Sequence, residues 1–302
     1  MSSTFAHTIP PRFSLALTGG RRLELEAGRP RLLGVVNITP DSFSDGGRFL
    51  LPDRAVEHAL RLLDEGAELL DLGAESTRPG GGVYGAGAAA VAADEELRRL
   101  LPVLERLRAV TQAPISVDTR KSAVAERALA AGADLVNDIG ALRDPAMREV
   151  VARAGCPAIL MHSRGELGGM QSDPRYDDVV AEVRGELAAA MTAAEGAGIA
   201  RSQLLVDPGL GFAKSAAHSL RLLASLDALG ALGAPVVLGA SRKSFLGQLT
   251  GDAVDRRLAA SLAAAAWAAS AGAALVRVHD VAETRQLLAV WRALAESREG
   301  AA

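Results

Sequence analysis

Polar and charged side chains recur directly after short apolar runs along this 302-residue sequence. The set consists of Asn37, Asp71, Asp118, Asn137, Asp138, His162, Asp207, Lys243, Arg277 and His279. Asp118, Asn137 and Asp207 combine acceptors with an amide donor, which suits the edge of a nitrogen heterocycle. If the apolar runs are neighbouring parallel strands, these residues meet at one end of a sheet. The pattern therefore predicts one converging polar site.

A second group of residues suits an anion or a metal–anion pair: Asn37, Lys243, Arg277 and His279. The planar guanidinium of Arg277 matches phosphate oxygens. Arg277 and His279 lie two residues apart, so in a strand they share a side while Val278 faces the other way. His279 also precedes a helix start, where backbone N–H groups favour an anion. The alternative for Arg277 is a structural ion pair inside the fold.

Eight apolar runs alternate with amphipathic helical patterns and predict the elements that position these residues. The predicted strands are 31–37, 68–73, 114–118, 134–138, 157–161, 204–207, 235–240 and 274–279. Eight strand–helix alternations are typical of an α/β protein with a (β/α)8 TIM barrel, in which the carboxyl ends of the strands carry the site. An open doubly wound sheet is the alternative architecture.

The first 30 residues differ from the rest and predict an N-terminal extension with a β-hairpin. Residues 13–17 and 23–25 alternate apolar and polar types around a turn at Thr18–Gly20. We expect this hairpin to cover the floor of the barrel without taking part in chemistry. Residues 31–298 are expected to form a single barrel domain, and Asp144 before Pro145 to cap one of its helices.

Composition and charge exclude several classes of function. The formal net charge is -3, which argues against nucleic acid as a partner. Cys156 is the only cysteine, so an internal disulfide is excluded and a reducing compartment is expected. The most apolar stretch, 258–276, is interrupted by Ser261 and Gly272, so no membrane segment is predicted. With no signal peptide pattern at the N-terminus, we expect a cytoplasmic protein.

Two glycine-containing segments, 38–51 and 74–93, follow the first two predicted strands. They are either lids that close over substrate or ordinary surface loops. The sequence contains no phosphate-binding loop of the GxxxxGK[ST] type and no Cys/His cluster with zinc spacing.

These segments contain the strongest resemblance to a known family. Asn37–Gly47 (NITPDSFSDGG) resembles the first signature of the dihydropteroate synthases, a family of pterin-binding TIM barrels, and Glu75–Gly80 (ESTRPG) resembles the second. Ser241–Ser244 (SRKS) and Arg277–Asp280 (RVHD) also look like blocks of this family, in the same order. The resemblance covers roughly residues 31–295. It implies a transferase of folate biosynthesis that condenses 6-hydroxymethyl-7,8-dihydropterin pyrophosphate with p-aminobenzoate, giving 7,8-dihydropteroate and pyrophosphate.

The resemblance also implies roles for individual residues. The pterin pyrophosphate would be bound by Thr77, Asp118, Asn137, Met161, Asp207, Lys243, Arg277 and His279. The p-aminobenzoate would be flanked by Thr77, Arg78, Pro79, Phe212 and Ser244. We expect catalytic contributions from Asp118, Lys243, Arg277 and His279. Asn37 would ligate Mg²⁺, and the chain would form a homodimer through its last helices.

Two other functions fit part of the pattern. A pterin-dependent methyltransferase could share the Asp and Asn contacts to the ring but would not need the Ser42–Gly47 segment or a pyrophosphate pocket. A non-catalytic paralogue could bind pterins without joining them, but its signature loops should be degraded, and here both are intact. A generic phosphate-binding barrel that acts on sugars fits the Asp–Asn–Asp set less well.

Overall fold

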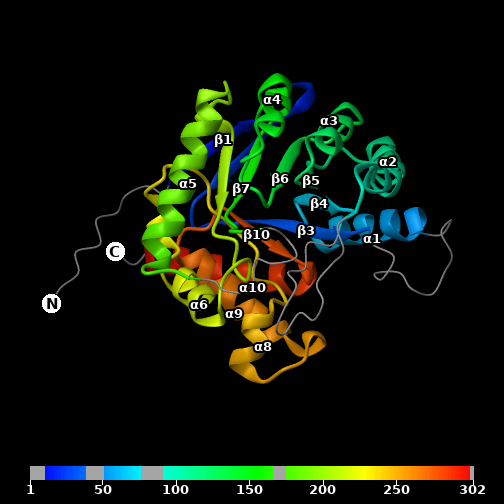
Figure 1. Ribbon diagram of the computed structural model, residues 1–302. Helices are drawn as coiled ribbons and strands as arrows, with labels where there is room; N and C mark the ends of the chain where they lie inside the picture. The colour runs from blue at the N-terminus through cyan, green and yellow to red at the C-terminus, as the bar shows by residue number, and fades with distance from the viewer. Residues whose placement is uncertain (1–10, 39–50, 76–90, 166–174, 300–302) are drawn as a thin grey trace.

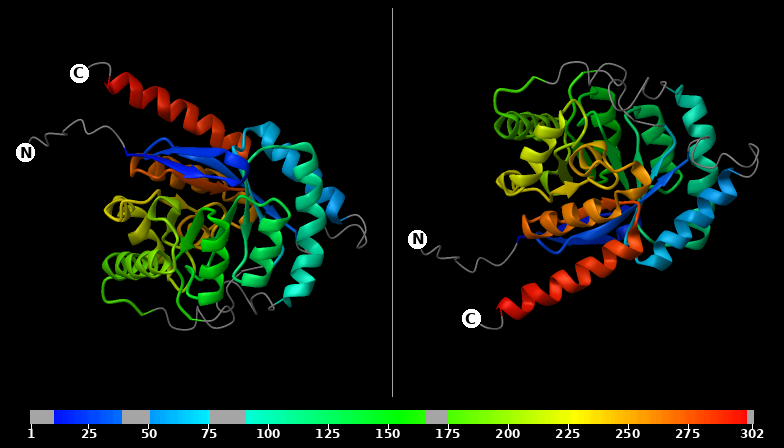
Figure 2. Two further views of the ribbon diagram at one scale, coloured as in Figure 1. Left: turned by 90° about the horizontal axis from the view of Figure 1, so that it is seen from above. Right: turned by 90° about the horizontal axis from the view of Figure 1, so that it is seen from below.

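The computed structural model describes residues 11–38, 51–75, 91–165 and 175–299. Its centre is an eight-stranded parallel sheet surrounded by helices (Figure 1). The strands are β3 (Arg31–Asn37), β4 (Leu69–Gly73), β5 (Ile115–Asp118), β6 (Leu135–Asp138), β7 (Ala158–Met161), β8 (Leu204–Asp207), β9 (Val237–Leu238) and β10 (Leu275–Val278). Figure 2 shows the helices on the outside from two further directions.

The sheet closes into a barrel. Its order is β8-β7-β6-β5-β4-β3-β10-β9, and a parallel bridge between Val206 and Val236 joins the two ends. The predicted TIM barrel is therefore confirmed and the open doubly wound sheet is wrong. The strand predicted over 235–240 forms a regular ladder only at Val237–Leu238. The other seven strands lie within one residue of the predicted ranges.

The helices follow the strands and bury their apolar faces against the sheet. They are α1 (Leu51–Glu65), α2 (Ala93–Val110), α3 (Ser122–Ala130), α4 (Pro145–Ala154), α5 (Val179–Gly196), α6 (Ala216–Ala224), α7 (Asp227–Gly230), α8 (Ser244–Thr250), α9 (Leu258–Ser270) and α10 (Val281–Glu299). The predicted cap of α4 is confirmed, since the Asp144 carboxylate accepts a hydrogen bond from the Ala146 amide at 3.0 Å. Helix α10 packs against α9 and α1 along the outside of the barrel (Figure 2).

A β-hairpin closes the amino-terminal end of the barrel. Its strands are β1 (Arg12–Ala16) and β2 (Arg22–Glu26), which pair antiparallel around a 3-10 turn at Thr18–Gly20. Its buried side chains pack against inward residues near the starts of the barrel strands. The cluster contains Leu15, Leu17, Leu23 and Leu25 of the hairpin segment with Leu33, Leu69, Leu135, Ile159, Leu205, Val237, Ala274 and Leu275. The hairpin thus fills the barrel floor with apolar atoms.

Asp134 connects the hairpin to the barrel. This fully buried carboxylate accepts hydrogen bonds from Thr18 Oγ1 at 2.6 Å and from the guanidinium groups of Arg21 and Arg108, each at 2.5 Å. It also accepts from the Ile115 amide at 3.0 Å. Two cations and two neutral donors therefore compensate one buried charge.

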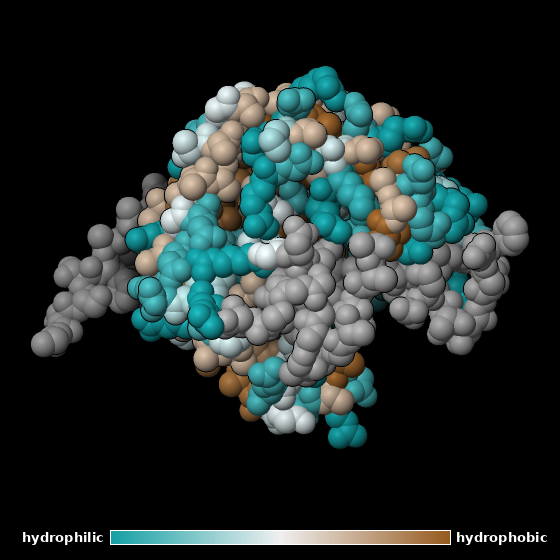
Figure 3. Space-filling view, viewed as in Figure 1, coloured by the Kyte–Doolittle hydropathy of each residue, from teal (hydrophilic) through white to brown (hydrophobic). Residues whose placement is uncertain are grey.

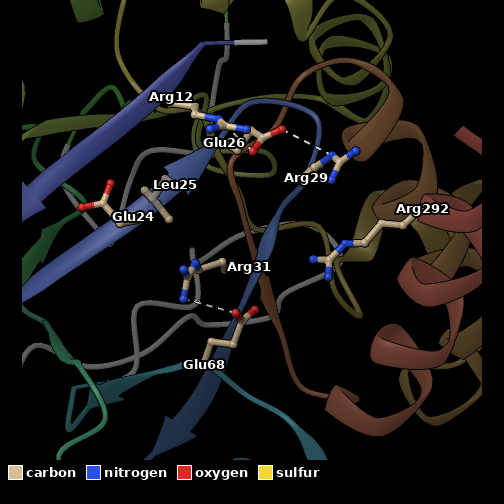
Figure 4. A pocket seen from close by; sticks show the side chains of 8 residues that line it. All are labelled: Arg12, Glu24, Leu25, Glu26, Arg29, Arg31, Glu68 and Arg292. Carbon is tan, nitrogen blue, oxygen red and sulfur yellow. Dashed lines mark ion pairs between the residues drawn. The ribbon is translucent and has the colours of Figure 1, made fainter. Parts of the chain in front are cut away.

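A cavity of about 500 Å³ lies beside the hairpin (Figure 4). Its charged side chains largely pair with each other: Arg12 and Arg29 each lie 3.3 Å from Glu26, and Arg31 lies 3.3 Å from Glu68. Arg292 of α10 reaches the carbonyl of Pro30 at 2.8 Å. This cavity is at the amino-terminal end of the barrel, opposite the polar strand ends. Its ion pairs lie within the hairpin segment and between β3 and Glu68, the residue before β4.

The face of the molecule in Figure 3 is mostly hydrophilic, with apolar patches around α8. Among the described residues, no helix combines the length and the apolar character needed to cross a bilayer.

Candidate active site

The two-residue period of the strands places polar side chains directly above the apolar barrel floor. In five strands a residue of the apolar floor cluster is followed two positions later by a polar residue or methionine that points into the barrel. The pairs are Leu69 and Asp71, Leu135 and Asn137, Ile159 and Met161, Leu205 and Asp207, and Leu275 and Arg277. Because side chains alternate along a strand, the residues that pack in the floor determine which later residues point inward at the carboxyl-terminal end, where TIM barrels carry their active sites.

Seven of the predicted site residues line one small cavity at this end. They are Asp118, Asn137, Met161, Asp207, Phe212, Lys243 and Arg277. The remaining walls are formed by Ile139, Gly209, Leu210 and Gly239. The cavity has a volume of about 30 Å³, because the long side chains of Lys243 and Arg277 extend into the space that the strand ends enclose. The structure thus brings together residues that are up to 159 positions apart.

Arg277 lies at the centre of a buried polar network. Its Nε donates to Asp71 Oδ2 at 2.6 Å, and its Nη2 donates to Asp118 Oδ2 at 2.9 Å. Asn137 Nδ2 donates to the same oxygen of Asp71 at 3.1 Å. Burial lowers the pKa of Arg277, but the charges of Asp71 and Asp118 outweigh it and the net shift is upward. Arg277 therefore remains a cation at any pH at which the protein is folded.

Asp71 is a site residue that the sequence analysis did not assign a role. Its side chain is fully buried and orients both Arg277 and Asn137. The signal was present, because a carboxylate in the apolar run Leu69–Gly73 needs a buried partner. The sequence does not say which of the chain's cations supplies that partner.

The carboxylates of the site keep unused acceptors. Asp118 Oδ1 and Asp71 Oδ1 are buried and have no hydrogen-bond partner among the described residues. Burial raises the pKa of Asp118 to about 7, with Arg277 opposing the shift and Asp71 adding to it. Burial also raises the pKa of Asp207, whose Oδ1 accepts from the Gly209 amide at 2.7 Å. Such groups are arranged to receive N–H donors from a ligand.

Lys243 and Phe212 form another side of the cavity. The Lys243 ammonium lies 4.0 Å from the centre of the Phe212 ring, a cation–π contact. Burial and the neighbouring Arg277 lower the pKa of Lys243 to about 8. Ser244, the next residue, is buried at the first position of α8 but does not line the cavity.

His279 and Asn37 lie outside this small cavity. The ring Nδ1 of His279 contacts Ser241 Oγ at 3.0 Å, directly before α10 begins. Burial, followed by the charge of Arg277, lowers the pKa of His279 to about 3, so its imidazole is neutral. Asn37 is exposed at the last position of β3, a strand that neighbours both β10 and β4. Thr77, Arg78 and Pro79 fall outside the described residues.

Comparisons with known proteins agree with this geometry. Residues 33–279 match the family described as pterin binding enzyme. The chain is 42% identical over 275 residues to the dihydropteroate synthase of Escherichia coli K12, covering 91% of this chain and 95% of that protein.

Solved structures give the same result. A Xanthomonas albilineans dihydropteroate synthase with 4-aminobenzoic acid shares 50% identity with a TM-score of 0.85, covering 95% of this chain and 98% of the other. A second structure of that enzyme, in complex with 7,8-dihydropteroate, shares 47% identity with a TM-score of 0.82 over 94% of this chain and 99% of the other. On its sequence, its fold and the placement of its polar strand ends, this chain belongs to the dihydropteroate synthases of the pterin-binding enzyme family.

Proposed function

We propose that this site binds 6-hydroxymethyl-7,8-dihydropterin pyrophosphate and p-aminobenzoate and condenses them to 7,8-dihydropteroate and pyrophosphate. The observation that carries the proposal is the cavity in which Asp118, Asn137 and Asp207 face Arg277 and Lys243. The related Xanthomonas albilineans structures, with 4-aminobenzoic acid and with 7,8-dihydropteroate, support the same substrates.

The acidic part of the cavity binds the pterin ring. A pterin presents ring and amino N–H donors next to acceptor atoms, and the unused Asp118 Oδ1 is a buried acceptor for such a donor. Asn137 supplies an amide and Asp207 a second carboxylate, while Met161 packs beside them. The guanidinium of Arg277, which lines the same cavity, lies against the face of the bound ring.

The basic part of the cavity receives the pyrophosphate. Arg277 and Lys243 supply positive charge, and the neutral His279 supplies a ring N–H donor beside the start of α10. Stabilisation of the charge that develops on a leaving group by one well-placed donor contributes about 3–4 kcal/mol to lowering a barrier.

Mg²⁺ fits this arrangement as a partner of the pyrophosphate. Magnesium retains several waters and is often bound by one or two protein oxygens plus substrate phosphates. Asn37 offers an exposed amide oxygen of this kind at the end of β3. The described residues contain no group of three His, Cys, Asp or Glu that could hold a metal by themselves. When bound, the ion would neutralise charge on the departing pyrophosphate.

p-Aminobenzoate is placed on the side of Phe212 and Lys243, with Ser244 behind them and Thr77, Arg78 and Pro79 contributed by the segment after β4.

The aromatic amine of p-aminobenzoate is neutral at pH 7 and needs no base to become a nucleophile. The electron-rich pterin can stabilise positive charge at its methylene, so the C–O bond to pyrophosphate breaks as or before the amine attacks the carbon. The amine then loses a proton to solvent. The chain's task is to align the reactants, which is worth roughly 7–11 kcal/mol.

The chain is further proposed to act as a cytoplasmic homodimer. Val290 and Leu294 lie four residues apart on α10, and their side chains are 63% and 62% exposed. Trp267 on the neighbouring α9 is 50% exposed. Two adjacent helices that present apolar side chains support pairing through this surface.

The deciding experiment incubates purified protein with Mg²⁺, the pterin pyrophosphate and p-aminobenzoate, and follows pyrophosphate and dihydropteroate. We expect equal amounts of both products, and a turnover at least about 100-fold lower for Arg277→Ala. Pterin binding without product would favour the non-catalytic paralogue. Methyl transfer from a reduced folate, with no condensation, would favour the methyltransferase.

A further inference from the structure

Lys214 is a buried lysine in the loop between β8 and α6, with 3% of its surface exposed. Its Nζ contacts three acceptors: Phe212 O at 2.9 Å, His162 Nδ1 at 2.8 Å and His162 O at 3.3 Å. Burial lowers the pKa of Lys214 to about 7, and its ammonium form has three N–H donors, each with an acceptor here. No carboxylate of the described residues lies within ion-pair distance of it. The contacts therefore connect two backbone segments, and none of them is an ion pair.

His162, which follows β7, is arranged to accept this bond. Its Nε2 lies 3.0 Å from Glu186 Oε2 on α5, so the proton belongs on Nε2 and the Nδ1 lone pair faces Lys214. Burial, followed by the charge of Lys214, lowers the pKa of His162 to about 3, which keeps the ring neutral. Glu186, His162 and Lys214 thus form a chain of hydrogen bonds from α5 to the loop after β8.

The loop itself is closely packed against the end of β7. Gly209 has φ +64°, and a Cβ there would lie 1.9 Å from His162 O. Ala213 has φ 49°, a left-handed conformation that a residue with a Cβ adopts only when its surroundings impose it. Between them Phe212 enters the site cavity, under the Lys243 ammonium and next to Met161 and Ile139. The hydrogen bonds of Lys214 to Phe212 O and to His162 connect this bend to the end of β7.

We infer that Lys214 is a positioning residue that holds the Phe212 wall of the p-aminobenzoate pocket through its bonds to Phe212 O and to His162. It touches neither substrate. This inference rests on the proposed function, because Phe212 matters to the reaction only if the second substrate binds beside it. The pterin contacts Asp118 and Asn137 lie on β5 and β6 and do not depend on this connection.

The test is a double-mutant cycle between Lys214 and Phe212. Lys214→Met removes the three hydrogen bonds and retains a long unbranched side chain. We expect the KM for p-aminobenzoate to rise about tenfold, while the calorimetric Kd for 6-hydroxymethylpterin changes less than twofold. Phe212→Ala also raises this KM, and the double variant should match Phe212→Ala alone, because Lys214 acts through Phe212. A merely structural residue would instead give additive effects.

Two further variants keep the outcome decisive. Arg153→Met removes a surface cation, which among the described residues forms an ion pair only with the exposed Glu126, and should leave both constants unchanged. If Lys214→Met does not fold, Lys214→Gln retains an amide donor and should give an intermediate KM. A wild-type KM in the folded Lys214 variant, or additive effects in the cycle, would overturn the inference. Absence of product from the wild-type enzyme would contradict the proposed function itself.

Discussion

At the residue scale, Asp118 combines a structural contact with the binding role proposed for it. Its Oδ2 accepts from Arg277, while its buried Oδ1 has no hydrogen-bond partner in the part of the chain that the structure describes. Because Asp71 lies on the other side of the same guanidinium, two carboxylates share one cation in a buried site. Burial and like charge then favour the protonated acid, which is why the pKa of Asp118 rises to about 7.

This shift predicts a pH dependence of pterin binding. Protonated Asp118 cannot accept through the oxygen that carries the proton, so the affinity for a pterin ligand should fall about tenfold between pH 8 and pH 6. Asp207, whose pKa is also raised, acts in the same direction. Calorimetric titrations across this range measure the effect, and Asp118→Asn should bind weakly with a flatter profile. Equal wild-type affinity at both pH values would contradict the prediction.

The same group has a consequence for stability. Its folded-state pKa of about 7 lies above the value of 3.8 that is usual for an aspartate in an unfolded chain. Between these two values the native state binds more protons than the unfolded chain. The contribution of Asp118 to the free energy of unfolding therefore falls as the pH rises from about 4 to about 7.

At the scale of elements, the hairpin and the site are two layers of the same barrel. The hairpin covers the inward residues at the strand starts, and the polar network occupies the next inward layer. Asp134 therefore lies at the opposite end of the barrel from the proposed substrate site, and its hydrogen bonds hold the hairpin that covers the barrel floor.

Asp134→Ala should destabilise the fold without changing the chemistry. The substitution leaves the half-buried Arg108 without its carboxylate, and removing one partner of a buried ion pair costs about 3–5 kcal/mol. Urea unfolding should show this loss, while kcat of the folded enzyme at 25 °C stays within about twofold of wild type. Glu126→Ala breaks an exposed pair with Arg153 and should cost less than about 1 kcal/mol. If Asp134→Ala and Glu126→Ala have equal free energies of unfolding, Asp134 does not stabilise the fold in this way.

At the scale of the whole molecule, closure of the barrel decides what surface remains for a partner. The Val206–Val236 bridge leaves the central sheet without a free edge, so strand addition to that sheet is not a route to assembly. The exposed apolar side chains of α9 and α10 remain as a candidate surface.

The double variant Val290→Asp, Leu294→Asp should convert a dimer into monomers, because two carboxylates cannot be desolvated at an apolar interface. Light scattering coupled to size-exclusion chromatography measures the mass. Val110→Asp introduces a similar charge at a side chain that is 64% exposed on α2 and should remain dimeric. An unchanged mass for the α10 variant would place the interface elsewhere.

Much of this protein was determined by its sequence alone. The barrel could be predicted because apolar runs and helical periods are local patterns. The identities of Asp118, Asn137, Asp207 and Arg277 as converging residues followed from the rule that parallel strands end on one rim. The hairpin could be predicted because its alternation and turn lie within 20 residues.

Only the tertiary structure decided which charges meet. That Asp71 binds Arg277 across 206 residues, and that Lys214 binds both His162 and Phe212, depends on which strands are neighbours and how far each side chain reaches. The short length of β9 was also decided by the tertiary structure, because a regular ladder forms only where both neighbouring strands offer partners in register. Periodicity along a chain specifies which side of an element a residue occupies, whereas hydrogen bonds between distant residues depend on packing in three dimensions.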